Sequence, residues 1–161
     1  MLVVRYVDRP GLHGDRAPRL LRYLLAKGAD EFTITVLALQ DTPGPFADAF
    51  EDELGPYELR GAERVVLTAA DSSKSTRFVR LWSFDATSLE RLLTFMDDGP
   101  FHSPPGPDGW LEDLTIYRRG ELLFGVVSHE QESVLRLTSD EHRELEALGI
   151  PSRETSESVR Y

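Results

Sequence analysis

The apolar residues of this chain change their period several times, and this change constrains the fold more than any other feature of the sequence. Segments in which apolar and β-branched residues alternate predict strands, whereas segments with an apolar residue every three or four positions predict amphipathic helices. In chain order the predicted elements are β-α-β-α-β-β-α-β-β-β-α. We therefore expect an α+β fold in which a mixed, mostly antiparallel sheet carries three to four helices, mainly on one side.

The N-terminal quarter of the chain predicts a strand, a helix and a second strand. Residues 2–7 are mostly apolar, and after a Pro/Gly turn Asp15 is placed to cap a helix that ends at Gly28. Residues 32–39 alternate in polarity and are rich in β-branched residues. If these two strands pair directly in parallel, the connection between them is right-handed. The apolar stripe of the helix is Ala17, Leu20, Leu21, Leu24 and Leu25.

The middle of the chain predicts a second helix, a hairpin and a third helix. The second helix opens at residues 43–45 and ends at residues 55–56. Residues 64–69 and 76–85 are expected to form two antiparallel strands. Thr87 and Glu90 have the spacing of a capping box for the third helix. The buried stripe predicted for the second helix is Phe46, Ala49, Phe50 and Leu54.

The C-terminal part predicts a meander of three strands and a short helix. Residues 114–118 and 121–128 form a hairpin about Arg119-Gly120, because glycine tolerates the positive φ that such a turn requires. Residues 133–137 add the third strand. Thr138 and Glu141 again have the spacing of a capping box, ahead of a helix that ends at Leu148.

Length and composition indicate a single globular domain. The 161 residues, of which 40% are hydrophobic and 29% charged, suit a single globular core. We assign residues 1–150 to a single α+β domain and residues 151–161 to a polar C-terminal tail. The absence of cysteine excludes disulfides, thiolate metal sites and a cysteine nucleophile. Without a signal-peptide pattern or a long apolar run, we expect no membrane contact and a cytoplasmic location.

Charge is the strongest functional signal in the sequence. The net charge is −10, and residues 30–59 contain eight acids and no base. Such a chain repels phosphate backbones, so we expect no nucleic-acid partner. Asp48, Glu51 and Asp52 share one face of the second predicted helix and are our candidates for docking onto a basic protein partner. The alternative is a solvated helix face that only keeps the protein soluble.

The loop at residues 97–109 is the second candidate contact. It holds seven of the chain's 12 glycines and 10 prolines, so it is stiffened. Phe101, inside the loop, and Trp110, just after it, either anchor a partner or fill the core. His102 is a weak catalytic candidate on the same loop.

The histidines are the only candidates for a catalytic site, and their spacing is not that of a metal site. His13 is near Asp8 and Asp15, so it is either a member of a carboxylate–histidine pair or a turn residue. His129 and Glu130 follow Ser128, but neighbours on a strand point to opposite faces, so a polar turn is the preferred interpretation. His142 is expected to be exposed on a charged helix face.

Two functional hypotheses remain. The preferred one is a non-catalytic protein-binding module, comparable in size, charge and lack of catalytic motif to the small acidic immunity or antitoxin proteins that neutralise a toxin by occlusion. The alternative is a small hydrolase or ligand-binding domain with a histidine/carboxylate site. The chain has neither GxxxxGK nor GxGxxG, so we expect no nucleotide cofactor, and no metal or other cofactor is indicated.

Overall fold

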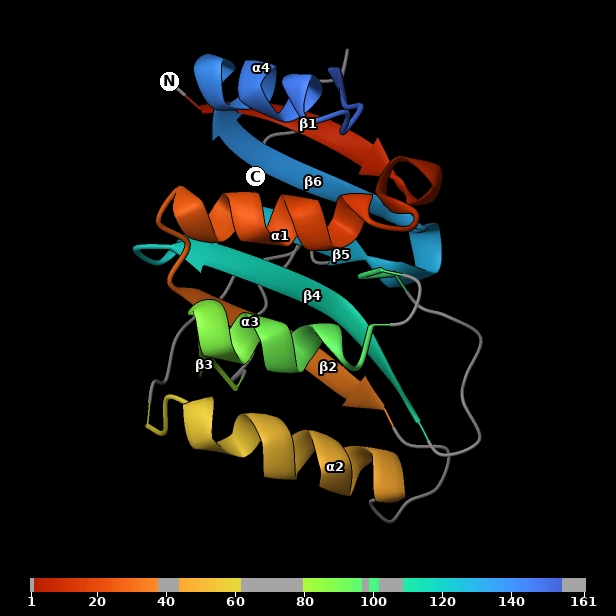
Figure 1. The fold of residues 1–161 in the computed structure, drawn as a ribbon, viewed down its shortest axis with the longest axis vertical. Coiled ribbons are helices and arrows are strands. Elements are labelled where there is room, and N and C mark those ends of the chain that lie inside the picture. Colours follow the sequence, from red (N-terminus) through yellow and green to blue (C-terminus); the bar gives the residue numbers. More distant parts are fainter. Residues whose placement is uncertain (1, 38–43, 62–79, 97–98, 102–108, 155–161) are drawn as a thin grey trace.

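The computed structural model describes residues 2–37, 44–61, 80–96, 99–101 and 109–154 (Figure 1). In this part of the chain four helices lie over one face of a seven-stranded sheet, which is the α+β class predicted from the sequence. The helices are α1 Arg16–Ala26, α2 Pro45–Leu54, α3 Ala86–Leu93 and α4 Ser139–Ala147. The strands are β1 Leu2–Asp8, β2 Glu31–Leu37, β3 Trp82–Ser83, β4 Trp110–Arg118, β5 Glu121–Val127, β6 Glu132–Thr138 and β7 Arg153–Glu154. Three single 3-10 turns are η1 Arg9–Leu12, η2 Gly55–Tyr57 and η3 Ser128–Glu130.

The sheet order is β3-β2-β4-β5-β6-β1-β7, and every pair of neighbours among the described strands is antiparallel. The direct parallel pairing of β1 with β2 that the sequence left open is therefore not formed. Instead β1 pairs with β6 along its whole length, from Leu2 opposite Thr138 to Asp8 opposite Glu132. The connection through α1 crosses three strands, and on its other side β1 pairs with β7 at one edge of the sheet.

Two local predictions about the meander and the last helix are confirmed. Arg119 and Gly120, with φ of 54° and 78°, form the tight turn between β4 and β5. Thr138 accepts a hydrogen bond from the backbone N–H of Glu141, whose carboxylate accepts one from the N–H of Thr138, so the capping box of α4 is complete. The predicted strand at residues 64–69 and residues 76–79 of the one at 76–85 lie outside the described residues, and within 80–85 the structure has the short strand β3.

The predicted cap of α3 is wrong by two residues. Asp85 is the N-cap, and its carboxylate accepts hydrogen bonds from the backbone N–H groups of Thr87 at 2.8 Å and Ser88 at 2.9 Å. The Ser88 hydroxyl accepts one from the N–H of Asp85 at 2.9 Å. Because this box starts the helix at Ala86, Thr87 and Glu90 lie inside it.

Aromatic side chains fill the core where α2 and α3 meet the sheet. Trp82 stacks on Phe32 with 5.5 Å between ring centroids and meets Phe50 edge-on at 5.8 Å. All three are at most 1% exposed. Phe95 adds another edge-on contact with Phe50 at 5.4 Å. Offset and edge-on pairs of this kind stabilise beyond their buried area, so the aromatic cluster fixes the position of α2 on the sheet.

Candidate functional site

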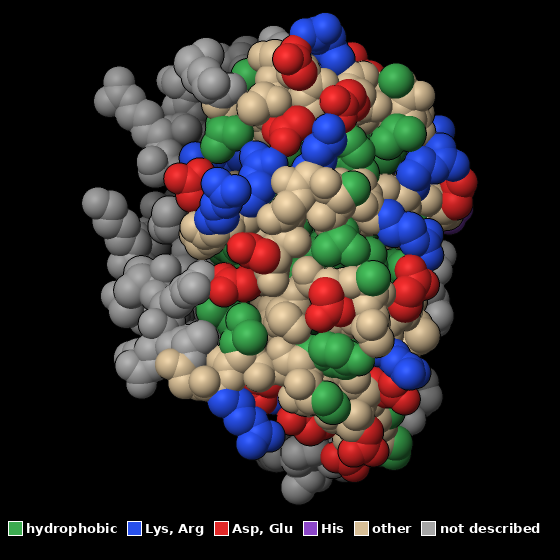
Figure 2. Space-filling model, turned by 60° about the vertical axis from the view of Figure 1, so that its left-hand side comes forward, with side chains coloured by type: hydrophobic (Ala, Val, Ile, Leu, Met, Phe, Trp, Pro, Cys, Tyr) green, Lys and Arg blue, Asp and Glu red, His purple; other side chains and the backbone are tan. Residues whose placement is uncertain are grey.

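The outer face of α2 carries the acidic residues that the sequence singled out. Phe50 and Leu54 are buried one turn apart and set the inner face of the helix. At 3.6 residues per turn, Asp48 and Asp52 then lie on the opposite side, and both are exposed. Ala49, predicted to be buried, is also exposed. Figure 2 shows Asp and Glu side chains gathered at the lower end of the molecule, where Figure 1 places α2.

Two arginines from distant parts of the chain neutralise the acids on the flanks of α2. Arg80, just before β3, donates to Glu51 at 2.9 Å and to Glu58 at 2.7 Å. On the other flank, Arg91 of α3 pairs with Glu53 at 3.0 Å. The acidic block has no base of its own in the sequence, but the fold supplies these two. In the described structure, fewer acidic side chains of α2 therefore lack an arginine partner than the sequence suggests.

Arg80 also packs on the aromatic cluster, and together with Glu51 and Glu58 it forms what we call the Arg80 clamp. Its guanidinium lies over the Trp82 ring, 5.0 Å from the centroid, while it bridges Glu51 and Glu58. The hydrogen bond from Arg80 lowers the pKa of Glu58, and the hydrogen bond to Glu58 raises the pKa of Arg80. The clamp therefore stays charged and holds the C-terminal end of α2 against the aromatic cluster.

Asp48 and Asp52 both have exposed side chains. Neither has an ion-pair partner among the described residues, and they stand four residues apart on one helix face. Like charges at this spacing cost an isolated helix about 0.2–0.5 kcal/mol. Asp48 recovers some of this in the first turn, where the helix dipole favours an anion. Within the described structure the pair therefore adds little stability.

The two aromatic contact candidates occupy different environments. Phe101 is 3% exposed and belongs to the main hydrophobic core, so its side chain is not presented to a partner. Trp110 is half-buried at the start of β4, and its indole Nε1–H donates to Glu112 at 2.8 Å. His102 and most of the loop at residues 97–109 lie outside the described residues.

The described histidines do not assemble a catalytic site. His13 is exposed beside η1, and His129 is exposed on η3, with its Nε2 3.8 Å from the Glu130 carboxylate. No hydrogen bond or ion pair joins the two histidines in the part of the chain that the structure describes. Within the same part, no cluster of three or more His, Asp or Glu side chains is arranged to hold a metal ion.

Ser128, next to His129, has a structural role. Its hydroxyl accepts a hydrogen bond from the Asp113 backbone N–H at 2.8 Å, and its own N–H donates to the Asp113 carboxylate at 2.9 Å. Asp113 lies at a bulge of β4 and has a positive φ of 54°. The reciprocal pair thus joins the bulged part of β4 to the residue that follows β5, beyond the last ladder pair of Thr115 opposite Gly125.

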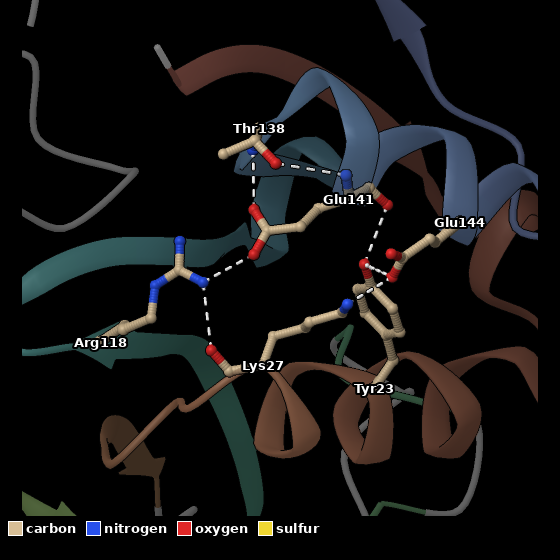
Figure 3. A network of polar contacts seen from close by, with 6 residues as sticks. All are labelled: Tyr23, Lys27, Arg118, Thr138, Glu141 and Glu144. Atoms are coloured by element: carbon tan, nitrogen blue, oxygen red, sulfur yellow. Dashed lines mark hydrogen bonds and ion pairs between the residues drawn. The ribbon is translucent and has the colours of Figure 1, made fainter.

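A polar network joins α1, the end of β4 and α4 (Figure 3). Arg118 donates to the Glu141 carboxylate at 2.7 Å and to the Lys27 carbonyl at 3.1 Å. Lys27 pairs with Glu144 at 2.5 Å, and the Tyr23 hydroxyl donates to the same carboxylate at 2.9 Å. Sequence reasoning missed this network because its members come from three separate elements.

The electrostatics of the network indicate a structural clamp. Burial, with the hydrogen bond to Glu144, raises the pKa of Tyr23, so its hydroxyl stays protonated and donates to the Glu144 carboxylate. Burial alone would raise the pKa of Glu141, but hydrogen bonds from Arg118 and Thr138 outweigh it and lower the pKa. These groups are therefore fixed in the charge states that hold the helices together.

No protein-family model matches the chain, and no curated protein or solved structure matches it either. None of the helices in the described residues is long and apolar enough to cross a membrane.

Proposed function

We propose that this chain is a non-catalytic, cytoplasmic protein-binding module that docks onto a basic protein partner through Asp48 and Asp52 on α2. The observation that carries the proposal is the contrast along one helix: Glu51 and Glu53 are paired with arginines, whereas these two aspartates are exposed and have no cation beside them among the described residues. A complementary cation would relieve their mutual repulsion, so binding has an electrostatic driving force.

Rigidity makes α2 a suitable docking element. The aromatic cluster holds its inner face, and the two arginine pairs hold its flanks. A preorganised helix loses little conformational freedom when a partner binds, so more of the interaction energy contributes to affinity. The carboxylates of Asp48 and Asp52 are thus presented on a fixed scaffold.

Occlusion of a basic partner requires no catalytic group. A small acidic protein of the immunity or antitoxin kind acts by covering a functional surface of its partner, and the net charge of −10 favours fast association with a cationic surface. Among the described residues, one histidine side chain pairs with a carboxylate: His129 Nε2 lies 3.8 Å from Glu130. Both side chains are exposed, so this pair gives the hydrolase alternative no enclosed site.

Co-purification from native cytoplasm tests the proposal. The test variant carries Asp48→Asn and Asp52→Asn, which keep side-chain shape and remove two charges. The control carries Glu121→Gln and Glu130→Gln, which make the same change in net charge at exposed sites on β5 and η3. We expect the unaltered protein and the control to retain a stoichiometric basic protein at low salt and release it at high salt.

The affinity for that identified partner then gives the quantitative test. Two exposed charges contribute on the order of 1 kcal/mol together, so the Asp48/Asp52 variant should bind about fivefold more weakly at low salt, with a shallower salt dependence. Equal affinity of the test variant and the control, or the absence of any salt-sensitive partner, contradicts the proposal.

A further inference from the structure

His142 is buried between α4 and β1, contrary to the exposure expected from its charged sequence neighbours. Its side chain is 0% exposed, and its Nε2 lies 2.9 Å from the Val3 carbonyl oxygen. A carbonyl oxygen only accepts hydrogen bonds, so Nε2 must carry the ring proton and Nδ1 is the unprotonated nitrogen. Nδ1 is buried and has no hydrogen-bond partner in the described structure. The environment of the ring in the docked helix therefore favours the neutral imidazole.

The charged groups around the ring are already engaged with one another. Arg5 reaches it from β1 and forms an ion pair with Glu146 of α4. Glu141, also on α4, is held by Arg118 at 2.7 Å. Neither carboxylate hydrogen-bonds the ring, so a proton added to Nδ1 would find no acceptor and would face the Arg5 cation.

The balance of these effects disfavours the imidazolium. Burial lowers the pKa of His142, and the charge of Arg5 lowers it further. The hydrogen bond to Val3 and the charges of Glu146 and Glu141 raise this pKa, but they do not cancel the decrease. Protons therefore bind less readily to His142 when α4 is docked than when the ring is in water.

Little apolar contact holds α4 in place. Leu145 is the only other buried residue within the helix, and its remaining contacts are largely ion pairs on the surface. The pKa values of Glu141 and Glu144 are both lowered from 4.5. For Glu141, burial acts in the opposite direction but is outweighed by hydrogen bonds from Arg118 and Thr138. For Glu144, hydrogen bonds from Lys27 and Tyr23 lower the pKa. These carboxylates stay charged between about pH 5 and 6.5, so their contacts do not change in the range where a histidine titrates.

We propose that His142 makes α4 a pH-sensitive latch, docked on β1 while the imidazole is neutral and released locally when the ring takes a second proton. The sign follows from linkage: the docked state has the lower histidine pKa, so docking is fully favoured above 6.5, the ordinary value, and weakens as the pH falls below it. The latch lies at the end of the molecule opposite α2 (Figure 1), so it is independent of the proposed binding surface.

Amide hydrogen exchange of the full chain tests the latch. From about pH 7.5 to about pH 5.5, after correction for intrinsic exchange, we expect the protection factors of α4 amides to fall by up to about tenfold while those of α1 are maintained. His142→Gln retains a donor for the Val3 carbonyl but does not titrate, so it should lose this pH dependence. The exposed His129→Gln is the matched control and should behave like the unaltered protein.

Three results would overturn the latch: unchanged α4 protection, the same pH dependence in His142→Gln, or equal loss of protection in α1, which would mean global unfolding. If His142→Gln does not fold, NMR titration of the unaltered protein decides. The latch requires the His142 ring to titrate below 6.5, the ordinary value, with the proton on Nε2 at neutral pH. A His142 pKa at or above 6.5 refutes it.

Discussion

Replacing Arg118 by methionine should destabilise the protein more than removal of any single exposed ion pair. The substitution keeps most of the aliphatic stem but removes the guanidinium, which donates to Glu141 at 2.7 Å and to the Lys27 carbonyl at 3.1 Å. The two charged side chains are only 23% and 13% exposed, so water compensates the loss incompletely. Glu141 keeps its hydrogen bond from Thr138, and its carboxylate remains half-buried without a cation.

The expected magnitude lies between two limits. A hydrogen bond to a charged group contributes about 1.5–3 kcal/mol, and removing one partner of a fully buried pair costs about 3–5 kcal/mol. Because Arg118 and Glu141 are partly exposed and one hydrogen bond to the carboxylate remains, we expect a loss of about 2 kcal/mol. For a domain of this size that corresponds to a fall in Tm of about 4–8 °C.

Urea unfolding followed by circular dichroism measures the loss. The matched control is Arg143→Met, which breaks the Asp140 pair, whose side chains are 74% and 78% exposed, and should cost about 0.5 kcal/mol or less. A double-mutant cycle with Glu141→Gln should give a coupling energy of at least about 1 kcal/mol. If Arg118→Met costs no more than Arg143→Met, the network does not hold α4 as described.

Three further perturbations test other parts of the account. Phe50→Ala should cost about 3–5 kcal/mol in urea unfolding, because it opens a cavity against Trp82 beneath α2; a loss under about 1 kcal/mol would mean that the cluster does not anchor the helix. Asp85→Ala should lower the free energy of unfolding by about 1 kcal/mol, because it removes both N-cap hydrogen bonds of α3. An unchanged urea midpoint would mean that Asp85 does not cap the helix. Since its folded-state pKa is lowered, Glu141 contributes stability that is present above pH 4.5 and lost as the pH falls through the lowered value. Glu141→Gln should therefore make the free energy of unfolding depend less steeply on pH below 4.5. An unchanged dependence would contradict a lowered pKa for Glu141.

Local sequence signals predicted the local structure well. The capping box of Thr138 and Glu141 and the turn at Arg119-Gly120 depend on residues at most three positions apart, so pattern and conformation coincide. The cap of α3 was missed because the preceding strand was extended through Asp85, which left Thr87 as the apparent start.

Contacts between residues far apart in the sequence could not be predicted from the local sequence patterns. The Arg80 clamp joins residues 22 and 29 positions apart, and only the sheet pairing brings them together. The position of β1 beside β6 depends in the same way on the complete topology. His142 is different, because a local signal existed: it precedes the buried Leu145 by three residues, which places both on one helix face. The charged neighbours of His142 obscured that spacing.

Carboxyl footprinting of the complex with the co-purified partner tests the central claim most directly, because it reports on individual Asp and Glu side chains. The account predicts that the labelling of Asp48 and Asp52 falls on binding while that of Glu121 and Glu130 stays the same. Unchanged labelling on α2, with protection elsewhere on the molecule, would contradict the assignment of α2 as the binding surface.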